Sequence, residues 1–124
     1  WLGTVALDSA AYNVATIMRA RHLRLYDDAF GDDPAAWAAV SPAEQLQAKI
    51  APFLAVCSSR RADSCPQADA FVAKARDLGA RAQVLPEALR HAEINEDLGQ
   101  PSAYTSAVDG FLASLDPALA ALLR

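Results

Sequence analysis

The sequence predicts an α/β fold with three layers, in which a parallel sheet is covered by helices. A continuous apolar run at residues 53–57 lies between Pro52 and two serines, a pattern typical of a strand buried on both faces of a parallel sheet. Residues 64–78 then repeat apolar side chains at helical spacing, and residues 81–85 form a second short strand. Strand, helix and strand in this order predict a right-handed βαβ unit with parallel strands.

The elements before this unit are predicted from shorter patterns. Residues 2–7 are mostly apolar with little alternation and predict a first strand that is also covered on both faces. Residues 11–50 carry apolar side chains at helical rather than strand spacing, so we expect short helices there. Two of them start at Asp33, which a proline follows, and at Ser41, which forms a capping box with Glu44.

Further helix boundaries are marked in the second half of the chain. Ser64 and Gln67 form a capping box at the start of the helix between the two strands. Ser102 caps a last amphipathic helix, and Asp116 with the proline after it begins a final apolar turn. No linker or repeat divides the chain, so residues 1–124 are interpreted as a single domain.

The composition excludes several classes of partner. The net charge of −4 and the pI near 5.0 argue against the basic face that nucleic acid or an anionic membrane surface requires. No apolar run reaches the roughly 18 residues of a membrane span, and we expect the cytoplasm as the compartment. Lysine is scarce beside arginine and alanine is abundant, which indicates a GC-rich bacterial source.

The two cysteines, Cys57 and Cys65, flank the turn that follows the second strand. Two cysteines are too few for a zinc site or a disulfide framework, and neither histidine is spaced near them as a ligand. We therefore expect no metal and no cofactor. The two residues are interpreted as partly buried thiols, and a local disulfide across the turn stays an open alternative.

A carboxylate and a histidine follow the two strands of the βαβ unit. Asp63 lies in the turn after residues 53–57, and His91 lies in the loop after residues 81–85. Because parallel strands end at the same rim of a sheet, the two side chains can meet. An aspartate that accepts a hydrogen bond from one imidazole nitrogen leaves the other nitrogen as a general base for a hydroxyl nucleophile. Asp63 and His91 are therefore the candidate catalytic residues.

Each candidate has a plainer interpretation. Asp63 can serve as turn chemistry before a helix, and His91 can be a capping or surface residue. Arg60 and Arg61 are interpreted as a solvated turn, although their charges would favour the ionised form of Asp63.

The order of strand, aspartate turn, helix, strand, histidine loop and final helix resembles the carboxyl-terminal part of an α/β-hydrolase of the esterase and lipase type. The segments that carry the resemblance span nearly the whole chain: VALDSAAYNV, LYDDAFGDDPAAWAAVSP, PFLAVCSSRRADSCPQADAF, and RHAEIN followed by DLG. The resemblance implies that residues 2–7, 53–57 and 81–85 are the sixth, seventh and eighth strands of that sheet. It also implies that residues 11–50 form a cap-like helical insertion over a substrate pocket.

The resemblance further implies a Ser-Asp-His triad with two members in this chain. Asp63 matches the acid after the seventh strand, and His91 matches the base after the eighth. Asp8 ends the sixth strand, where some relatives place the acid, but Asp63 is the preferred residue although its turn lacks the usual glycine. The nucleophilic serine of such enzymes lies in a G-x-S-x-G elbow, which this sequence does not contain, so we expect it upstream of Trp1. The chain also begins as if inside a strand, as a piece of a longer protein would.

The implied activity is the hydrolysis of a small-molecule carboxylic ester, and this chain alone is expected to be inactive. The sequence does not indicate which acyl group or which alcohol group the substrate carries. An alternative from another class is a non-catalytic α/β interaction module. Its open sheet edge would pair with a partner chain, a second copy of the chain or the missing amino-terminal segment.

Overall fold

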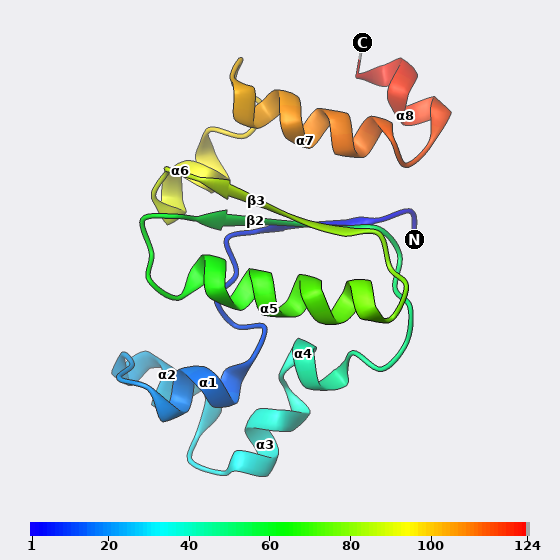
Figure 1. Cartoon of the computed structure of the whole chain (residues 1–124). Helices are drawn as coiled ribbons and strands as arrows, with labels where there is room; N and C mark the ends of the chain where they lie inside the picture. Colours follow the sequence, from blue (N-terminus) through cyan, green and yellow to red (C-terminus); the bar gives the residue numbers. More distant parts are fainter. Residues whose placement is uncertain (124) are drawn as a thin grey trace.

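The computed structural model describes residues 1–123 and contains a parallel sheet with helices on both faces (Figure 1). The strands are β1 (Thr4–Leu7), β2 (Phe53–Ser58) and β3 (Ala82–Glu87), and they lie side by side in the order of the chain. The helices are α1 (Val14–Arg19), α2 (Arg24–Phe30), α3 (Pro34–Ala39), α4 (Pro42–Gln45), α5 (Ser64–Asp77), α6 (His91–Glu96), α7 (Ala103–Ala113) and α8 (Pro117–Leu122). None of these described helices is long and apolar enough to cross a lipid bilayer. The predicted α/β class is confirmed.

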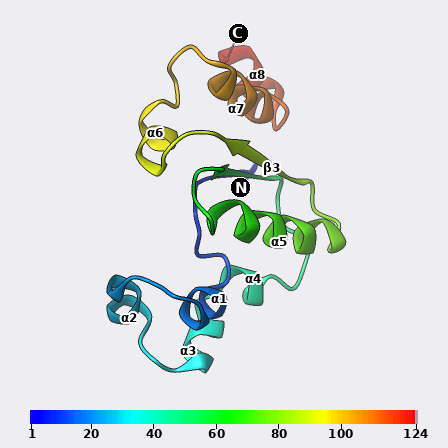
Figure 2. The same ribbon diagram turned by 60° about the vertical axis from the view of Figure 1, so that its left-hand side comes forward.

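The helices divide between the two faces of the sheet. α5 covers one face, and α1 to α4 lie beyond α5 on the same side, whereas α6, α7 and α8 lie on the other side (Figures 1 and 2). Alternate residues of β2 point to opposite faces, so Ala55 and Cys57 pack in the apolar cluster under α5. Leu54 and Val56 pack in the second cluster, which includes Ile94 of α6 and residues of α7. The central strand therefore holds both halves of the core together.

β2 is buried as the sequence predicts, whereas β1 is half-buried at the edge of the sheet. Residues 54–58 of β2 are buried, and their parallel neighbours place Leu7 opposite Val56 and Glu87 opposite Ser58. β1 is only half-buried along its length, because no strand within residues 1–123 pairs with its outer edge. Its side chains nevertheless pack on both faces of the sheet, with Ala6 against the cluster under α5 and Val5 and Leu7 against the second cluster, as the sequence predicts.

Three predicted helix starts are confirmed by their capping hydrogen bonds. The side chains of Asp33, Ser102 and Asp116 each accept a hydrogen bond from a backbone N–H of the first helical turn of α3, α7 and α8, respectively. These bonds satisfy N–H groups that have no partner within the helix. Proline is favoured at the first position of α3 and of α8 because it has no N–H that would need a partner there. An aspartate followed by proline is therefore a recognisable helix start in the sequence.

The two predicted capping boxes are wrong, because both serine hydroxyls make tertiary contacts. Ser41 precedes α4, but its buried Oγ accepts from the N–H of Val14 at 2.8 Å and donates to the carbonyl of Trp37 at 2.7 Å. Ser64 lies inside α5, whose N-cap position is Asp63. Ser41 thus connects α1 to the α3–α4 segment, and Ser64 is free for a contact in the candidate site.

The last strand is longer than predicted and leads directly into a helix. β3 continues through Pro86 to Glu87, whereas the sequence predicts a strand that ends at residue 85. The carbonyl of Glu87 accepts from Ser59 at 2.9 Å, so alternate residues of β3 face β2 and the nitrogen of Pro86 faces the open outer edge. His91 is accordingly the first residue of α6 rather than a loop residue.

The segment that leaves β1 is fixed against α5 by two contacts. The rings of Tyr12 and Phe71 stack with their centroids 4.8 Å apart. The Gln67 side chain accepts from the N–H of Asn13 at 2.8 Å and donates to its carbonyl at 3.1 Å. These contacts hold the exit of β1 beneath the start of α5, where Asp8 lies.

Candidate active site

Asp8 follows β1 directly and occupies the centre of the candidate site. Its backbone N–H donates to the carbonyl of Val56 at 2.8 Å, so the ladder with β2 continues through this residue. Its φ of 60° then turns the chain away from the sheet, and within residues 1–123 it is the single non-glycine residue with a positive φ. Left-handed backbone is strained for residues with a side chain and occurs preferentially at functional sites.

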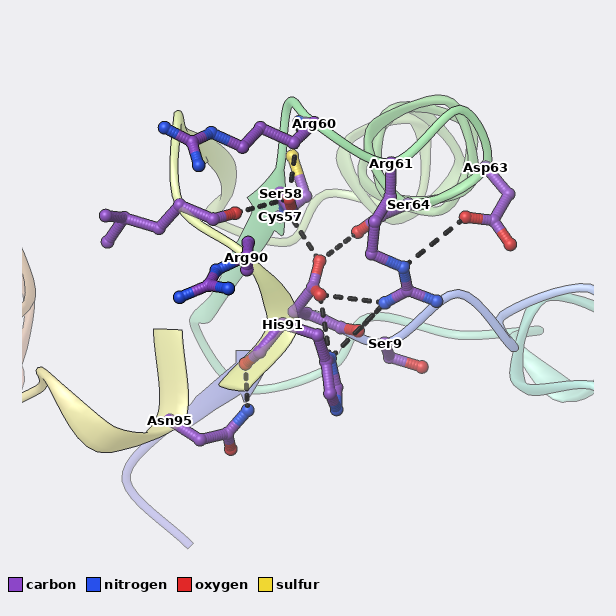
Figure 3. A network of polar contacts seen from close by, with 12 residues as sticks. Ser9, Cys57, Ser58, Arg60, Arg61, Asp63, Ser64, Arg90, His91 and Asn95 are labelled. Carbon is purple, nitrogen blue, oxygen red and sulfur yellow. Dashed lines mark hydrogen bonds and ion pairs between the residues drawn. The ribbon is translucent and has the colours of Figure 1, made fainter. Parts of the chain in front are cut away.

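Four donors surround the Asp8 carboxylate, and Asp8 is only 1% exposed (Figure 3). Oδ1 accepts from the backbone N–H of Ser58 at 2.6 Å and from the hydroxyl of Ser64. Oδ2 accepts from Nη1 of Arg61 and from Nδ1 of His91, each at 2.7 Å. Burying an ionised carboxylate is very unfavourable unless it is paired and hydrogen-bonded, and these four donors meet that requirement.

Burial and hydrogen bonding act in opposite directions on the pKa of Asp8. Burial raises this pKa, because desolvation disfavours the charged form, but the four hydrogen bonds outweigh burial and hold the pKa below its usual value of 3.8. Asp8 is therefore ionised at neutral pH. Since its pKa is lowered on folding, its contribution to stability is complete above pH 3.8 and is lost as the pH falls through the lowered value.

The imidazole of His91 is held at one nitrogen and free at the other. Nδ1 lies 2.7 Å from Oδ2 of Asp8, a distance at which Nδ1 carries the proton and donates. The ring extends from this contact toward solvent (Figure 3), and the His91 side chain is 61% exposed. Asn95, one turn later, donates to the carbonyl of His91 at 2.9 Å and supports the start of α6. Nε2 therefore presents its lone pair outward, as a general base must.

The structure corrects the expected pairing of Asp63 with His91. Asp63 is half-exposed, and its carboxylate lies 3.7 Å from Nε of Arg61 (Figure 3), whereas Nη1 of the same guanidinium donates to Asp8. His91 contacts Asp8 instead, which is the alternative acid position. The reason is that the turn after β2 directs Asp63 outward at the start of α5, while the left-handed turn after β1 directs Asp8 inward under the same rim.

Arg61 is a site residue that the sequence did not identify. Its Nη1 donates to the backbone carbonyl of Asp8 at 3.0 Å as well as to Oδ2, so it bridges both ends of the strained residue. The same nitrogen lies 3.3 Å from Nδ1 of His91. A guanidinium only donates, so the proton on Nδ1 and the Arg61 N–H converge on one oxygen of Asp8. Two adjacent arginines in a turn do not indicate which of them points inward.

The two cysteines form a disulfide, so their interpretation as free thiols is wrong. Cys57 near the end of β2 and Cys65 in the first turn of α5 are bonded, with their Cα atoms 5.1 Å apart. Residues close in sequence at a strand–turn–helix junction can reach disulfide geometry because the turn folds back on itself. No cluster of three or more metal-ligating side chains is present within residues 1–123.

A cavity of about 900 Å³ lies between α5 and the segment that carries α1 and α2. Its wall includes the apolar residues Ile17 and Phe71, and its volume falls within the range of small-molecule sites, about 300–1,000 Å³. Arg61 also lines it, so one side chain contacts both the cavity and Asp8. Tyr12, also in the wall, has a buried hydroxyl without a partner among the described residues, and burial raises its pKa to about 12.

Comparison with known proteins yields no relative for this chain. No family model matches it, and neither the curated proteins nor the solved structures contain a match.

Replacing Arg61 by alanine should destabilise the fold, because the buried Asp8 charge then loses a donor. We expect a loss of about 2 kcal/mol in the free energy of unfolding, typical of a hydrogen bond to a charged group. Arg60→Ala is the matched control: Arg60 is exposed, and within residues 1–123 only its backbone N–H makes a hydrogen bond, to the hydroxyl of Ser58 at 3.3 Å. Its effect should stay within about 0.5 kcal/mol. Urea denaturation of both variants measures the difference, and equal effects would refute the role of Arg61.

Proposed function

We propose that this chain supplies the acid and the base of a hydrolase that acts on small-molecule carboxylic esters. The observation that carries the proposal is the hydrogen bond between the buried Asp8 carboxylate and Nδ1 of His91, whose ring is exposed. A buried, ionised acid behind a solvent-facing imidazole is the arrangement that activates a hydroxyl nucleophile for acyl transfer.

The proposed reaction proceeds in two acyl-transfer steps. Nε2 of His91 accepts the proton of a serine hydroxyl as the serine oxygen attacks the ester carbonyl, and Asp8 stabilises the imidazolium. The imidazolium then protonates the leaving alkoxide, which leaves the acyl group on the serine. A water molecule, deprotonated by His91 in turn, releases the carboxylic acid and restores the serine. No serine hydroxyl within residues 1–123 hydrogen-bonds to Nε2, and we place the nucleophile in another segment of the parent protein.

The arrangement of the strands supports the resemblance to an α/β-hydrolase. Three parallel strands lie in chain order, with a carboxylate after the first and a histidine after the third. We therefore identify β1, β2 and β3 as the sixth, seventh and eighth strands of such a sheet, with the acid at Asp8 rather than at Asp63. The helices within residues 11–50 would be the cap-like insertion, and the cavity beside α1 and α2 is compatible with that role.

Activity of the full-length protein toward p-nitrophenyl acetate tests this assignment. His91→Ala should lower kcat by at least about 10³-fold, since the general base is lost. Asp8→Asn should lower kcat by about 10²- to 10⁴-fold, because an amide cannot hold the Nδ1-protonated imidazole or stabilise its charge.

Asp63→Asn is the matched control for this experiment, since it makes the same chemical change two residues from Arg61. The exposed Asp63 carboxylate has no contact with His91, so this variant should retain wild-type kcat. A protein in which Asp63→Asn abolishes activity while Asp8→Asn retains it would have its acid at Asp63, and the proposal would be wrong.

The open edge of β1 favours a second candidate function, association through strand addition. The N–H of Thr4 donates to the carbonyl of Pro52, just before β2, at 2.9 Å, and the N–H of Asp8 donates to the carbonyl of Val56 in β2 at 2.8 Å. Because backbone groups alternate along a strand, those of Val5 and Leu7 face the outer edge, which no strand within residues 1–123 occupies. An unpaired row of this kind is a template for another strand, and we infer a second copy of the chain as its partner.

Self-association of this kind should be abolished by Val5→Pro. Proline removes an outward N–H and none of the hydrogen bonds that join β1 to β2. Sedimentation equilibrium should show dimers of the wild-type chain and monomers of the variant. A wild-type chain that stays monomeric at all concentrations, or a variant that dimerises equally well, would exclude this mode of association.

A further inference from the structure

The disulfide links the two ends of the segment 58–64, which supplies hydrogen bonds to the Asp8 carboxylate. Three of the four donors to the Asp8 carboxylate lie between the two cysteines: Ser58, Arg61 and Ser64. Ser58 directly follows Cys57 and Ser64 directly precedes Cys65, so the two donors to Oδ1 are the immediate neighbours of the bonded residues (Figure 3 shows Cys57 beside Ser58). The covalent bond therefore sets the spacing of the two groups that fix one oxygen of the acid.

We propose that the redox state of the Cys57–Cys65 disulfide controls how residues 58–64 hold the Asp8 carboxylate toward His91. We call the disulfide and residues 58–64 the clasp, which is closed when the bond is formed and open when it is reduced. With the bond formed, residues 58–64 hold the carboxylate toward His91. With the bond reduced, no covalent link across the turn holds Ser58 near Ser64, and their spacing depends on the packing of α5 against β2 and on their hydrogen bonds to Asp8. Asp8, in its strained left-handed conformation, then loses the constraint that directs it inward. The consequence for catalysis rests on the function proposed above, whereas the change in the grip on Asp8 does not.

The two sulfur atoms differ in their access to a reductant. Cys57 is fully buried, whereas Cys65 is partly exposed on the first turn of α5. A thiolate of an external dithiol would therefore attack Sγ of Cys65, break the Sγ–Sγ bond and expel Cys57 as a thiolate, which takes up a proton. The mixed disulfide joins Sγ of Cys65 to one sulfur of the dithiol. The second thiol of the dithiol attacks this reductant sulfur and releases Cys65 as a thiol. Two electrons pass to the protein, and the dithiol becomes a cyclic disulfide.

The state of the clasp depends on the compartment. Disulfides persist in oxidising compartments and are reduced in the cytoplasm of most cells. In the cytoplasm, which the sequence suggested, the clasp would be open, and in an oxidising compartment it would be closed. The proposed acid–base pair would then be competent only after export or under oxidative conditions.

Hydrogen exchange of the Ser58 amide measures the clasp directly, because this N–H donates to Oδ1 of Asp8. Treatment of the chain with dithiothreitol should accelerate exchange at Ser58 by about tenfold or more, while the amide of Val108 in the core of α7 changes much less. Unchanged exchange at Ser58 would overturn the proposal. Equal acceleration at Ser58 and Val108 would also overturn it, since the bond would then only stabilise the whole fold.

The double variant Cys57→Ala/Cys65→Ala reproduces the open clasp without a reductant. Its Ser58 amide should exchange as fast as that of the reduced wild-type chain and should not respond to dithiothreitol. If the variant does not fold, the wild-type chain titrated with dithiothreitol, with free thiols counted at each point, gives the same answer. Exchange does not require hydrolysis, so a full-length protein that stays inactive with the disulfide formed, but whose Ser58 exchange still responds to dithiothreitol, would refute the proposed function and leave this inference standing.

Discussion

The buried carboxylate of Asp8 is the constraint on which the arrangement of the site depends. Moving an ionised group out of water costs several kcal/mol even after the protein relaxes, so the surrounding structure must supply partners. Two donors bind Oδ1 and two bind Oδ2, and they come from the end of β2, the turn after it, the start of α5 and the start of α6. Removing any of these elements would take away at least one donor of the buried charge. One acidic residue thus ties together the ends of all three strands.

The parallel sheet makes this convergence possible. β1, β2 and β3 all end at one rim, with Leu7 opposite Val56 and Ser58 opposite Glu87. The next residues of each chain segment therefore emerge close together although they are far apart in sequence. Asp8 and His91 are separated by 83 residues and meet at 2.7 Å. Apolar side chains pack on both faces of β2 and support this rim, as the proposed acid–base pair would require.

Features that depend on neighbouring residues in the sequence could be predicted, whereas features that depend on tertiary contacts could not. The strands, the βαβ unit and the role of the rim could be predicted because burial patterns and turn residues are local signals. Asp63 and Asp8 both follow strands at that rim, and the choice between them depends on which turn points inward, which neither turn reveals alone. Ser64 looked like a helix cap for the same reason, and its hydroxyl instead serves Asp8. The predicted position of His91 at the rim is correct, but its partner there is Asp8 and not Asp63.

The tautomer of the His91 imidazole reports on its pairing with Asp8, and ¹⁵N NMR of the histidine-labelled chain measures it at neutral pH. We expect the Nδ1-protonated tautomer in the wild type and in Asp63→Asn. In Asp8→Asn the amide N–H₂ should face His91 while its oxygen keeps the donors Ser58 and Ser64, so Nδ1 must accept and the proton moves to Nε2. A tautomer that changes in Asp63→Asn and persists in Asp8→Asn would contradict the account.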